Sequence, residues 1–365
     1  MQAATRRQVL ITVPAMALTP ALGACRNAAQ AQPAVSVPPL KQVAPFPLGV
    51  TAMTGEFNDP QFVSLLTANF SQLTPEWEMK MEAILRDDGG FDWSRSDAIA
   101  GFTADHGLRL HGHTLIWYAQ KPPAFLRLDG AGQRFADAYR NYILAVAGRY
   151  RGHVVGWDVV NEAINENGEG ERDCLWSRNL GPDYAGLAYR HAREADPDAP
   201  LFLNDYFLDT MPNKRRSFLR MAERLLKSGA PLTGLGTQTH VSIHMAPGAI
   251  KAALHDLASL GLPIHLSELD VSTRNREGVK GALDLTPVPE RLARQARVVH
   301  EAAEAYMALP ERQRYAFTIW GVRDRDSWLR RPPNAGEGTD QPLLFDDDGR
   351  PKPAARALVE AFSGR

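Results

Sequence analysis

The chain has 365 residues, of which 44% are hydrophobic and 23% are charged. This balance is typical of a globular protein and excludes a largely disordered chain, and the length allows one large domain or two ordinary ones. The formal net charge of -1 leaves no overall field that would draw nucleic acid or an anionic membrane surface towards the folded part. We therefore expect a neutral partner and no nucleic acid.

Residues 1–24 are predicted to be an export signal. Thr5-Arg6-Arg7-Gln8-Val9-Leu10 opens an apolar run that ends at Ala24, and this run is too short and too interrupted by proline to span a bilayer. The arginine pair indicates a twin-arginine signal. Leu22-Gly23-Ala24-Cys25 resembles the lipobox of bacterial lipoproteins, and the alternative is an ordinary cleavage site with an incidental cysteine. Both interpretations predict an exported protein: periplasmic, anchored to the membrane through a lipid on Cys25, or secreted.

Residues 25–46 are rich in Ala, Gln, Pro and Val without helical or strand period, which predicts a flexible tether. The only cysteines are Cys25 and Cys174. If Cys25 is lipidated or removed with the signal, no intramolecular disulfide is possible, and stability must come from the hydrophobic core.

Beyond the tether, short apolar runs alternate with longer stretches of helical period, as in a parallel sheet with crossover helices. The alternation predicts a (β/α)8 TIM barrel of the α/β class in a single domain, residues 47–365, although a doubly wound sheet gives a similar pattern. The expected strands are residues 48–52, 70–73, 108–115, 154–160, 200–203, 234–237, 263–267 and 316–320, with helices at 134–149, 187–195, 213–228 and 289–308 and a closing helix within 346–365.

The positions of polar residues favour the barrel. Barrel enzymes carry their chemistry at the carboxyl ends of several strands, and here at least six of the expected strands end in such residues. They are His113 and Trp117 after the third strand, Asn161 and Glu162 after the fourth, Asn204-Asp205-Tyr206 after the fifth, Gln238 and His240 after the sixth, Glu268 and Asp270 after the seventh, and Trp320 after the eighth.

Two carboxylates stand out at these strand ends. Glu162 ends the buried run 154–160, where partial burial would raise the pKa of its carboxyl group and suit it to be a general acid. Glu268 follows the run 263–267, and strand alternation places it on the same face as Asp270. Such a pair is what glycosidic bond cleavage requires, whereas an ion pair with an arginine at the barrel rim is the structural alternative for Glu162.

Histidines and tryptophans support this interpretation. Gln238 and His240, two residues apart on the sixth strand, are expected beside Glu268, so that His240 bonds Glu268 and Asp270 holds His240. His111-Gly112-His113 lacks the spacing of a helical zinc pair, and we expect no metal and no cofactor. Trp117, Trp320 and Trp328 offer flat indole faces on which pyranose rings stack.

Ordered motifs along residues 48–362 resemble glycoside hydrolase family 10, the family of endo-1,4-beta-xylanases. The motifs are Thr74-Pro75-Glu76 with Met79-Lys80, Gly112-His113-Thr114-Leu115-Ile116-Trp117, Trp157-Asp158-Val159-Val160-Asn161-Glu162-Ala163, Asn204-Asp205-Tyr206, Gln238-Thr239-His240, Glu268-Leu269-Asp270, Trp320-Gly321-Val322 and Pro342-Leu343-Leu344-Phe345-Asp346.

The resemblance implies a retaining enzyme on a (β/α)8 barrel that cuts xylan internally without a cofactor. Glu162 would be the acid/base and Glu268 the nucleophile. The resemblance also implies that Asn161 binds the 2-hydroxyl of the sugar that is cleaved, that His113 and Gln238 flank that sugar, and that His240, held by Asp270, orients Glu268. Glu76, Lys80 and Trp117 would line the glycone side of the cleft. Trp320 and Trp328 would form its aromatic walls and lid.

Three positions depart from the usual family pattern. Trp77 and Phe207 stand where asparagine is usual, and Tyr118 stands where histidine is usual. Each change replaces a polar partner with an aromatic ring, so hydrogen bonds to sugar hydroxyls are lost and stacking area is gained. The substrate is therefore expected to be xylan or decorated xylo-oligosaccharides, with another β-glycan as the alternative.

Two other classes of protein are less consistent with the sequence. A barrel that kept glycan binding but lost catalysis is opposed by Asn161, Glu162, His240 and Glu268 together, and a structural lipoprotein does not explain the two acids. Hydrolysis of an aryl glycoside would exclude the non-catalytic barrel. We expect a monomeric enzyme.

Overall fold

The computed structural model describes residues 36–274, 285–335 and 339–364. The predictions for the export signal, for Cys25 and for most of the tether fall outside these residues. Within the described ranges, no helix is both long and apolar enough to cross a membrane.

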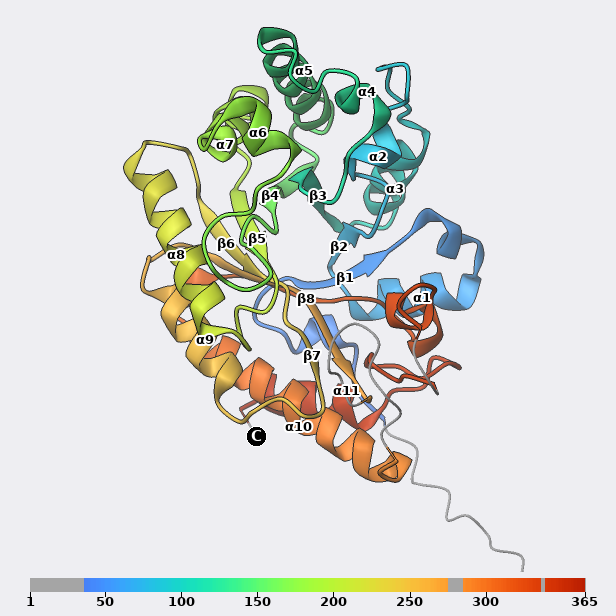
Figure 1. Cartoon of the computed structure of the whole chain (residues 1–365). Helices are drawn as coiled ribbons and strands as arrows, with labels where there is room; N and C mark the ends of the chain where they lie inside the picture. The colour runs from blue at the N-terminus through green and yellow to red at the C-terminus, as the bar shows by residue number, and fades with distance from the viewer. Residues whose placement is uncertain (1–35, 275–284, 336–338, 365) are drawn as a thin grey trace, which may run out of the picture. The chain divides into compact units, whose positions relative to one another are not determined.

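Parallel strands form the centre of the described chain (Figure 1). Most are almost entirely buried, because both faces of each strand are covered, which explains why they read as continuous apolar runs in the sequence. The strands are β1 (Leu48–Ala52), β2 (Gln72–Pro75), β3 (Arg109–Trp117), β4 (Val154–Asn161), β5 (Leu201–Asp205), β6 (Gly234–Thr237), β7 (His240–Ser242), β8 (Ile264–Ser272) and β9 (Arg314–Ile319).

The sheet closes into a barrel. Its order is β6-β5-β4-β3-β2-β1-β9-β8-β7, and β6 also pairs with β8, with Leu235 opposite Ile264. Eight strands thus form the ring, while the short β7 continues along β8 with His240 opposite Asp270. The predicted (β/α)8 barrel is confirmed, and the doubly wound alternative is wrong.

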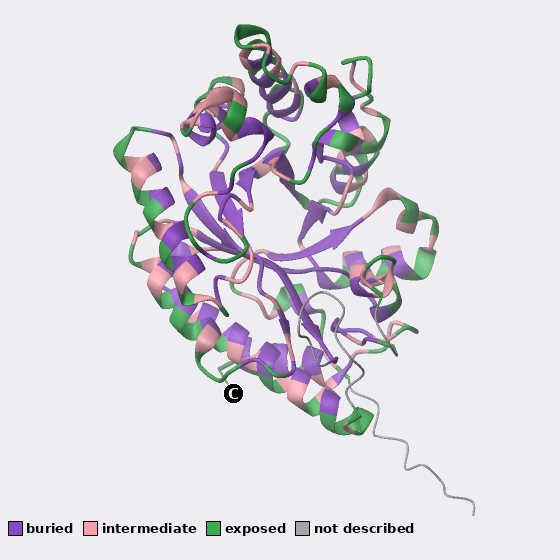
Figure 2. Cartoon of the chain, in the orientation of Figure 1, coloured by how far each residue is buried: buried purple, intermediate pink, exposed green. Residues whose placement is uncertain are grey.

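Helices surround the barrel, and Figure 2 shows that they are buried on one side and exposed on the other. In α8, for example, Phe218, Met221 and Leu225 are buried at helical spacing, and Pro212 occupies the first turn, where no intrahelical donor is needed. The helices are α1 (Pro60–Asn69), α2 (Met81–Ile84), α3 (Ser94–Asp105), α4 (Pro123–Leu126), α5 (Gln133–Arg149), α6 (Leu175–Leu180), α7 (Tyr184–Ala195), α8 (Pro212–Lys227), α9 (Ala249–Ala258), α10 (Val288–Met307) and α11 (Pro353–Phe362), with short 3₁₀ helices at Leu40–Gln42, Thr54–Asn58, Glu311–Gln313, Asp324–Asp326 and Trp328–Arg330.

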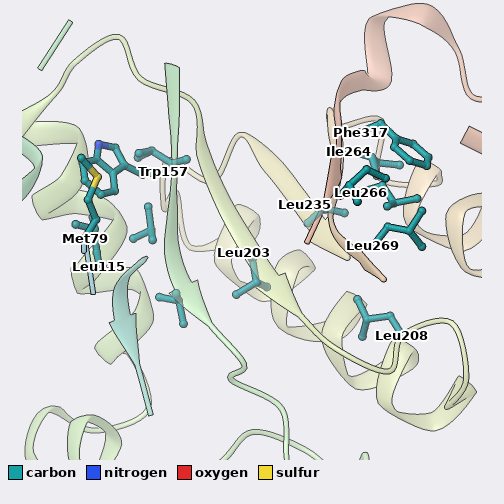
Figure 3. Close-up of a cluster of buried hydrophobic side chains, with 14 of the residues drawn as sticks. Met79, Leu115, Trp157, Leu203, Leu208, Leu235, Ile264, Leu266, Leu269 and Phe317 are labelled. Carbon is teal, nitrogen blue, oxygen red and sulfur yellow. The ribbon is translucent and has the colours of Figure 1, made fainter. Parts of the chain in front are cut away.

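The core lies between the strands and these helices. Side chains from most of the barrel strands contribute to it, among them Leu115, Trp157, Leu203 and Phe317 (Figure 3). Burying apolar surface on this scale is the main stabilising contribution in a domain whose one described cysteine, Cys174, is free.

Two expectations are corrected. The tether does not extend to residue 46, because Leu40 is fully buried and Phe46 packs edge to face on Tyr306 at 4.9 Å. His240 does not share a strand with Gln238, because the backbone between β6 and β7 turns at Thr239, whose φ is 59°.

Close packing at Gly112 generates a prediction for stability. A Cβ atom there would lie 2.2 Å from the ring of Trp157, which is fully buried. Gly112→Ala should therefore lower the free energy of unfolding by about 1–3 kcal/mol, as measured by urea denaturation. Gly101 is an exposed position of α3 where an added Cβ would meet nothing within 4 Å. Gly101→Ala should therefore leave the free energy of unfolding unchanged or raise it by about 0.5–1 kcal/mol. Equal effects would contradict the packing argument.

Candidate active site

A cavity of about 470 Å³ opens at the carboxyl ends of the barrel strands, where barrel proteins place their functional groups. The structure brings almost all of the predicted site residues together there, with Asp270 directly behind the lining. The predicted residues that line the cavity are Glu76, Lys80, His113, Trp117, Asn161, Glu162, Gln238, His240, Glu268, Trp320 and Trp328.

Glu162 lies immediately after β4. Its backbone is left-handed, with a φ of 57°, which turns its side chain into the cavity. Trp117 Nε1 donates to Glu162 Oε2 at 2.7 Å, and Gln238 Nε2 donates to Oε1 at 3.0 Å. The carboxyl group is thus held at a fixed position between the ends of three strands.

The electrostatic environment of Glu162 suits a proton donor. Burial raises the pKa of its carboxyl group, and the nearby Asp205 and Glu268 carboxylates raise it further. The hydrogen bonds from Gln238 and Trp117 oppose this rise because they stabilise the charged form. A carboxyl group balanced in this way can hold a proton and later accept one.

Glu268 lies on β8, which is three strands from β4 through β5 and β6 and five strands from it in the other direction. Only 4% of its surface is exposed. Asn204 Nδ2 donates to Glu268 Oε1 at 2.7 Å, and His240 Nε2 lies 3.3 Å from Oε2. Both carboxylate oxygens of Glu268 therefore have a hydrogen-bond partner.

His240 connects Glu268 to Asp270. Its Nδ1 lies 2.9 Å from Asp270 Oδ2, which also accepts a hydrogen bond from Trp328 Nε1 at 2.7 Å. Burial opposes a charge on the imidazole, but the carboxylates of Asp270 and Glu268 outweigh it and raise the pKa of His240 to about 10. At neutral pH both ring nitrogens therefore carry protons and donate to the two carboxylates. This geometry matches the Asp-His-Glu chain predicted from the sequence.

Asn204, at the end of β5, links the two halves of the site. Its Nδ2 also donates to Asn161 Oδ1 at 2.9 Å, while its Oδ1 accepts from Ser267 Oγ at 2.8 Å. The motif Asn204-Asp205-Tyr206 does not by itself indicate this bridging role of Asn204. The bridge fixes Asn161 relative to Glu268.

Arg172 is a second residue that sequence reasoning missed. It is largely buried, and its guanidinium group donates to the backbone carbonyl of Glu162 at 3.2 Å and to the Tyr206 hydroxyl at 3.0 Å. Its carbon Cζ also lies 3.7 Å from the ring centroid of Tyr118. No periodicity or spacing signals this role, because Arg172 lies in a loop whose course the sequence does not define.

Glu76 and Lys80 form another part of the cavity, after β2. Lys80 Nζ lies 4.7 Å from the ring centroid of Trp117, and Glu76 makes an ion pair with Arg331. Burial raises the pKa of Glu76, while the charges of Arg331 and Lys80 oppose the rise. Trp77 is half-buried and does not contribute to the cavity lining, in contrast to Tyr118 and Phe207.

A buried polar network supports His113 from the barrel interior. Asp158 lies 2.8 Å from His113 Nδ1 and 3.2 Å from His111 Nε2. Burial opposes the charge of Asp158, yet the two histidines hold its pKa well below the usual range. His111, Asp158 and His265 also bring potential metal-ligand atoms within 4.8 Å of one another, in the interior rather than in the cavity lining. The network fixes the ring of His113 against the cleft.

The fold and the site together define a (β/α)8-barrel protein whose cleft holds two carboxylates in different electrostatic environments, the arrangement found in glycoside hydrolases. Residues 40–361 match the family described as glycosyl hydrolase family 10. The chain belongs to this family.

Individual relatives agree with this assignment. An endo-1,4-beta-xylanase A from Caldicellulosiruptor saccharolyticus is 35% identical over 303 residues, covering 81% of this chain and 87% of that protein. An endo-1,4-beta-xylanase A from Thermoanaerobacterium saccharolyticum is 32% identical over 86% of this chain, which spans only 27% of that relative's length.

Solved structures show the same barrel. The catalytic core of a xylanase A superposes with a TM-score of 0.81 at 32% identity, covering 89% of this chain and 100% of that one. A mutant of xylanase A from P fluorescens subsp. cellulosa, in complex with xylopentaose, gives a TM-score of 0.80 at 32% identity over 89% of this chain and 100% of that chain.

The hydrogen bond from Gln238 generates a prediction for Glu162. Because this bond lowers the pKa of Glu162, Gln238→Ala should raise it above the wild-type value. The change can be measured by following the carboxyl ¹³C signal of Glu162 against pH. Gln120→Ala removes an amide that bonds Glu82 instead, and should leave this titration unchanged. A downward shift in Gln238→Ala would contradict the assignment.

The imidazolium of His240 generates a prediction for stability. Its folded pKa of about 10 lies above the ordinary value of 6.5, so its contribution to stability is complete below pH 6.5 and is lost as pH rises towards 10. Unfolding free energy measured from pH 6 to 10 should therefore fall more steeply for the wild type than for Asp270→Asn, in which the pKa of His240 is lower. Parallel curves for the two proteins would show that Asp270 does not hold this proton.

Proposed function

We propose that the protein is an endo-acting retaining glycoside hydrolase that cleaves internal β-1,4-xylosidic bonds of xylan or decorated xylo-oligosaccharides by double displacement. The observation that carries the proposal is the pair of carboxylates in one cleft, Glu162 with a raised pKa and Glu268 with donors on both oxygens. Family membership and the names of the relatives, which include several endo-1,4-beta-xylanases, support the substrate class.

In the first displacement, Glu268 attacks the anomeric carbon of the bound sugar. Glu162 gives its proton to the glycosidic oxygen as the bond to that carbon breaks, and the leaving chain departs as a neutral alcohol. The product of this step is a glycosyl ester on Glu268. Burial raises the pKa of Glu162 and so favours its protonated form beforehand, which suits it to act as the acid.

In the second displacement, the ionised Glu162 takes a proton from water, and the water oxygen attacks the same anomeric carbon. The ester bond to Glu268 breaks and its carboxylate is restored, while Glu162 is again protonated. The imidazolium of His240 and the amide of Asn204 stabilise the departing carboxylate. Two inversions at one carbon give net retention.

The remaining cavity residues would hold the sugar chain. Asn161, fixed by Asn204, faces the cleft beside Glu162 and suits the 2-hydroxyl of the sugar that is cleaved. Trp320 packs edge to face on His113 at 5.5 Å, so its indole forms a rigid wall of the cavity. Preorganised contacts of this kind place the anomeric carbon between the two carboxylates.

Substitution of the two carboxylates tests their roles. Glu268→Ala should abolish turnover of xylan and of aryl xylobiosides, because no ester can form. Glu162→Ala should slow xylan cleavage by roughly 10²–10⁴-fold but slow release of an activated nitrophenolate much less, since that leaving group needs no proton. Steady-state kinetics on both substrates measure this difference, and equal losses would remove Glu162 from the acid role.

The products test the substrate and the mode of cleavage. Xylan, glucuronoxylan, arabinoxylan and cellulose should be compared, with product length followed by chromatography and anomeric configuration by ¹H NMR. Internal cuts in xylan with β-configured products are expected. Turnover of cellulose without turnover of xylan would transfer the proposal to another β-glycan.

We also propose that the protein is exported by its twin-arginine-type signal and is periplasmic, anchored through Cys25, or secreted. The support is the sequence of residues 5–10 and 22–25. Cell fractionation should find the wild type in the membrane fraction and Cys25→Ala in the soluble fraction if the lipid anchor is present.

Light scattering of the purified domain should give the mass of a monomer.

A further inference from the structure

Three aromatic residues line the cavity after the two strands on either side of β4, the strand that Glu162 follows. Tyr118 follows β3, while Tyr206 and Phe207 follow β5, the two strands that flank β4 in the ring. All three line the cavity and are partly exposed. Glu76 and Lys80 lie after β2, so this aromatic wall, defined as Tyr118, Tyr206 and Phe207, belongs to a different part of the mouth.

Two rings of the aromatic wall are fixed by buried cations. Arg172 Cζ lies 3.7 Å from the ring centroid of Tyr118, and Lys214 Nζ lies 3.2 Å from that of Tyr206. Lys214 is fully buried and pairs with Asp205 at 2.9 Å. Each cation occupies one face of its ring, which holds the ring in place before a ligand binds.

The polar groups beside the aromatic wall already bind one another. The Tyr206 hydroxyl donates to Glu166 Oε1 at 2.9 Å and accepts from Arg172 Nη2 at 3.0 Å. A sugar hydroxyl at this wall would have to compete with these bonds. An aromatic ring would not, because ring contacts use the open faces and edges that remain.

Phe207 adopts a backbone conformation that is unfavourable for a phenylalanine. Its φ is 59°, a left-handed conformation that bulky residues rarely adopt and that asparagine or glycine adopts readily. Its ring packs edge to face on Tyr206 at 4.8 Å and lines the cavity. Strained positions of this kind cluster where a ligand is bound, so the strain points to a role for the ring in the cleft.

We propose that the aromatic wall binds the leaving group and selects one that carries an aromatic ring, such as a phenolic or other aryl aglycone on a xylosyl chain, with Phe207 as the specificity-determining residue. This inference rests on the proposed function, in which Glu162 protonates the leaving oxygen and the leaving group therefore lies beside Glu162. Stacked or edge-to-face rings then bind the leaving group in addition to the contacts that hold the sugars.

The test compares benzyl β-xylobioside with cyclohexylmethyl β-xylobioside. Both release a primary alcohol of similar size, so the comparison isolates the aromatic ring from leaving-group chemistry. The wild type should show a kcat/KM about threefold to tenfold higher for the benzyl substrate. Phe207→Asn should bring the ratio of the two kcat/KM values towards one, and Phe207→Leu, which keeps an apolar side chain without a ring, should do the same.

Stability separates a binding role of Phe207 from a structural one. Because asparagine tolerates the left-handed backbone, Phe207→Asn should raise the melting temperature by about 2 °C while it lowers the preference for the benzyl substrate. A lower melting temperature with an unchanged preference would make Phe207 structural and overturn the proposal.

The wild-type rates separate this inference from the proposed function. Hydrolysis of xylan with equal kcat/KM for the two xylobiosides would leave the proposed function standing and overturn the aromatic selectivity. Failure to hydrolyse xylan and both xylobiosides would overturn the proposed function and this inference with it.

Discussion

The pairing of β6 with β8 determines the site, because it closes the ring of strands. The register Thr237 opposite Leu266 brings the end of β6 beside the end of β8. Gln238 can then reach Glu162 across the mouth while His240 reaches Glu268 on the neighbouring strand. Closure also brings β8 within three strands of β4, so Glu162 and Glu268 line a single cavity.

Backbone strain gathers at the same rim. Glu162, Phe207 and Thr239 are the described non-glycine residues with positive φ, and they follow β4, β5 and β6. Each such conformation is disfavoured by roughly 1–3 kcal/mol, which a well-packed barrel can offset with its buried apolar surface. The packed interior can thus compensate for unfavourable backbone conformations at the carboxyl ends of β4, β5 and β6, and two of these residues, Glu162 and Phe207, line the cavity.

The sequence predicts the barrel well because buried parallel strands are continuous apolar runs. Boundaries are less accurate where two elements adjoin: residues 70–73 were expected as a strand, yet Phe70 caps α1 through a bond to Leu66 and β2 begins at Gln72. The geometry brings the expected site residues together, while their catalytic roles stay predictions. Asn204 could not be assigned, because its partner Glu268 is distant in the chain and meets it only after closure. Arg172 could not be assigned, because it lies in a loop whose course the sequence does not define.

Two residues of the same type acquire different properties in this cleft. Around Glu162, burial and neighbouring carboxylates favour the protonated form, and neutral donors only moderate that effect. Around Glu268, the amide of Asn204 donates to one carboxylate oxygen, and the imidazole of His240, whose pKa is raised to about 10, lies beside the other. The positive charge on His240 depends in turn on Asp270, which is buried. The surroundings of Glu268 therefore depend on Asp270, which contacts His240 and not Glu268 itself, and which does not line the cavity.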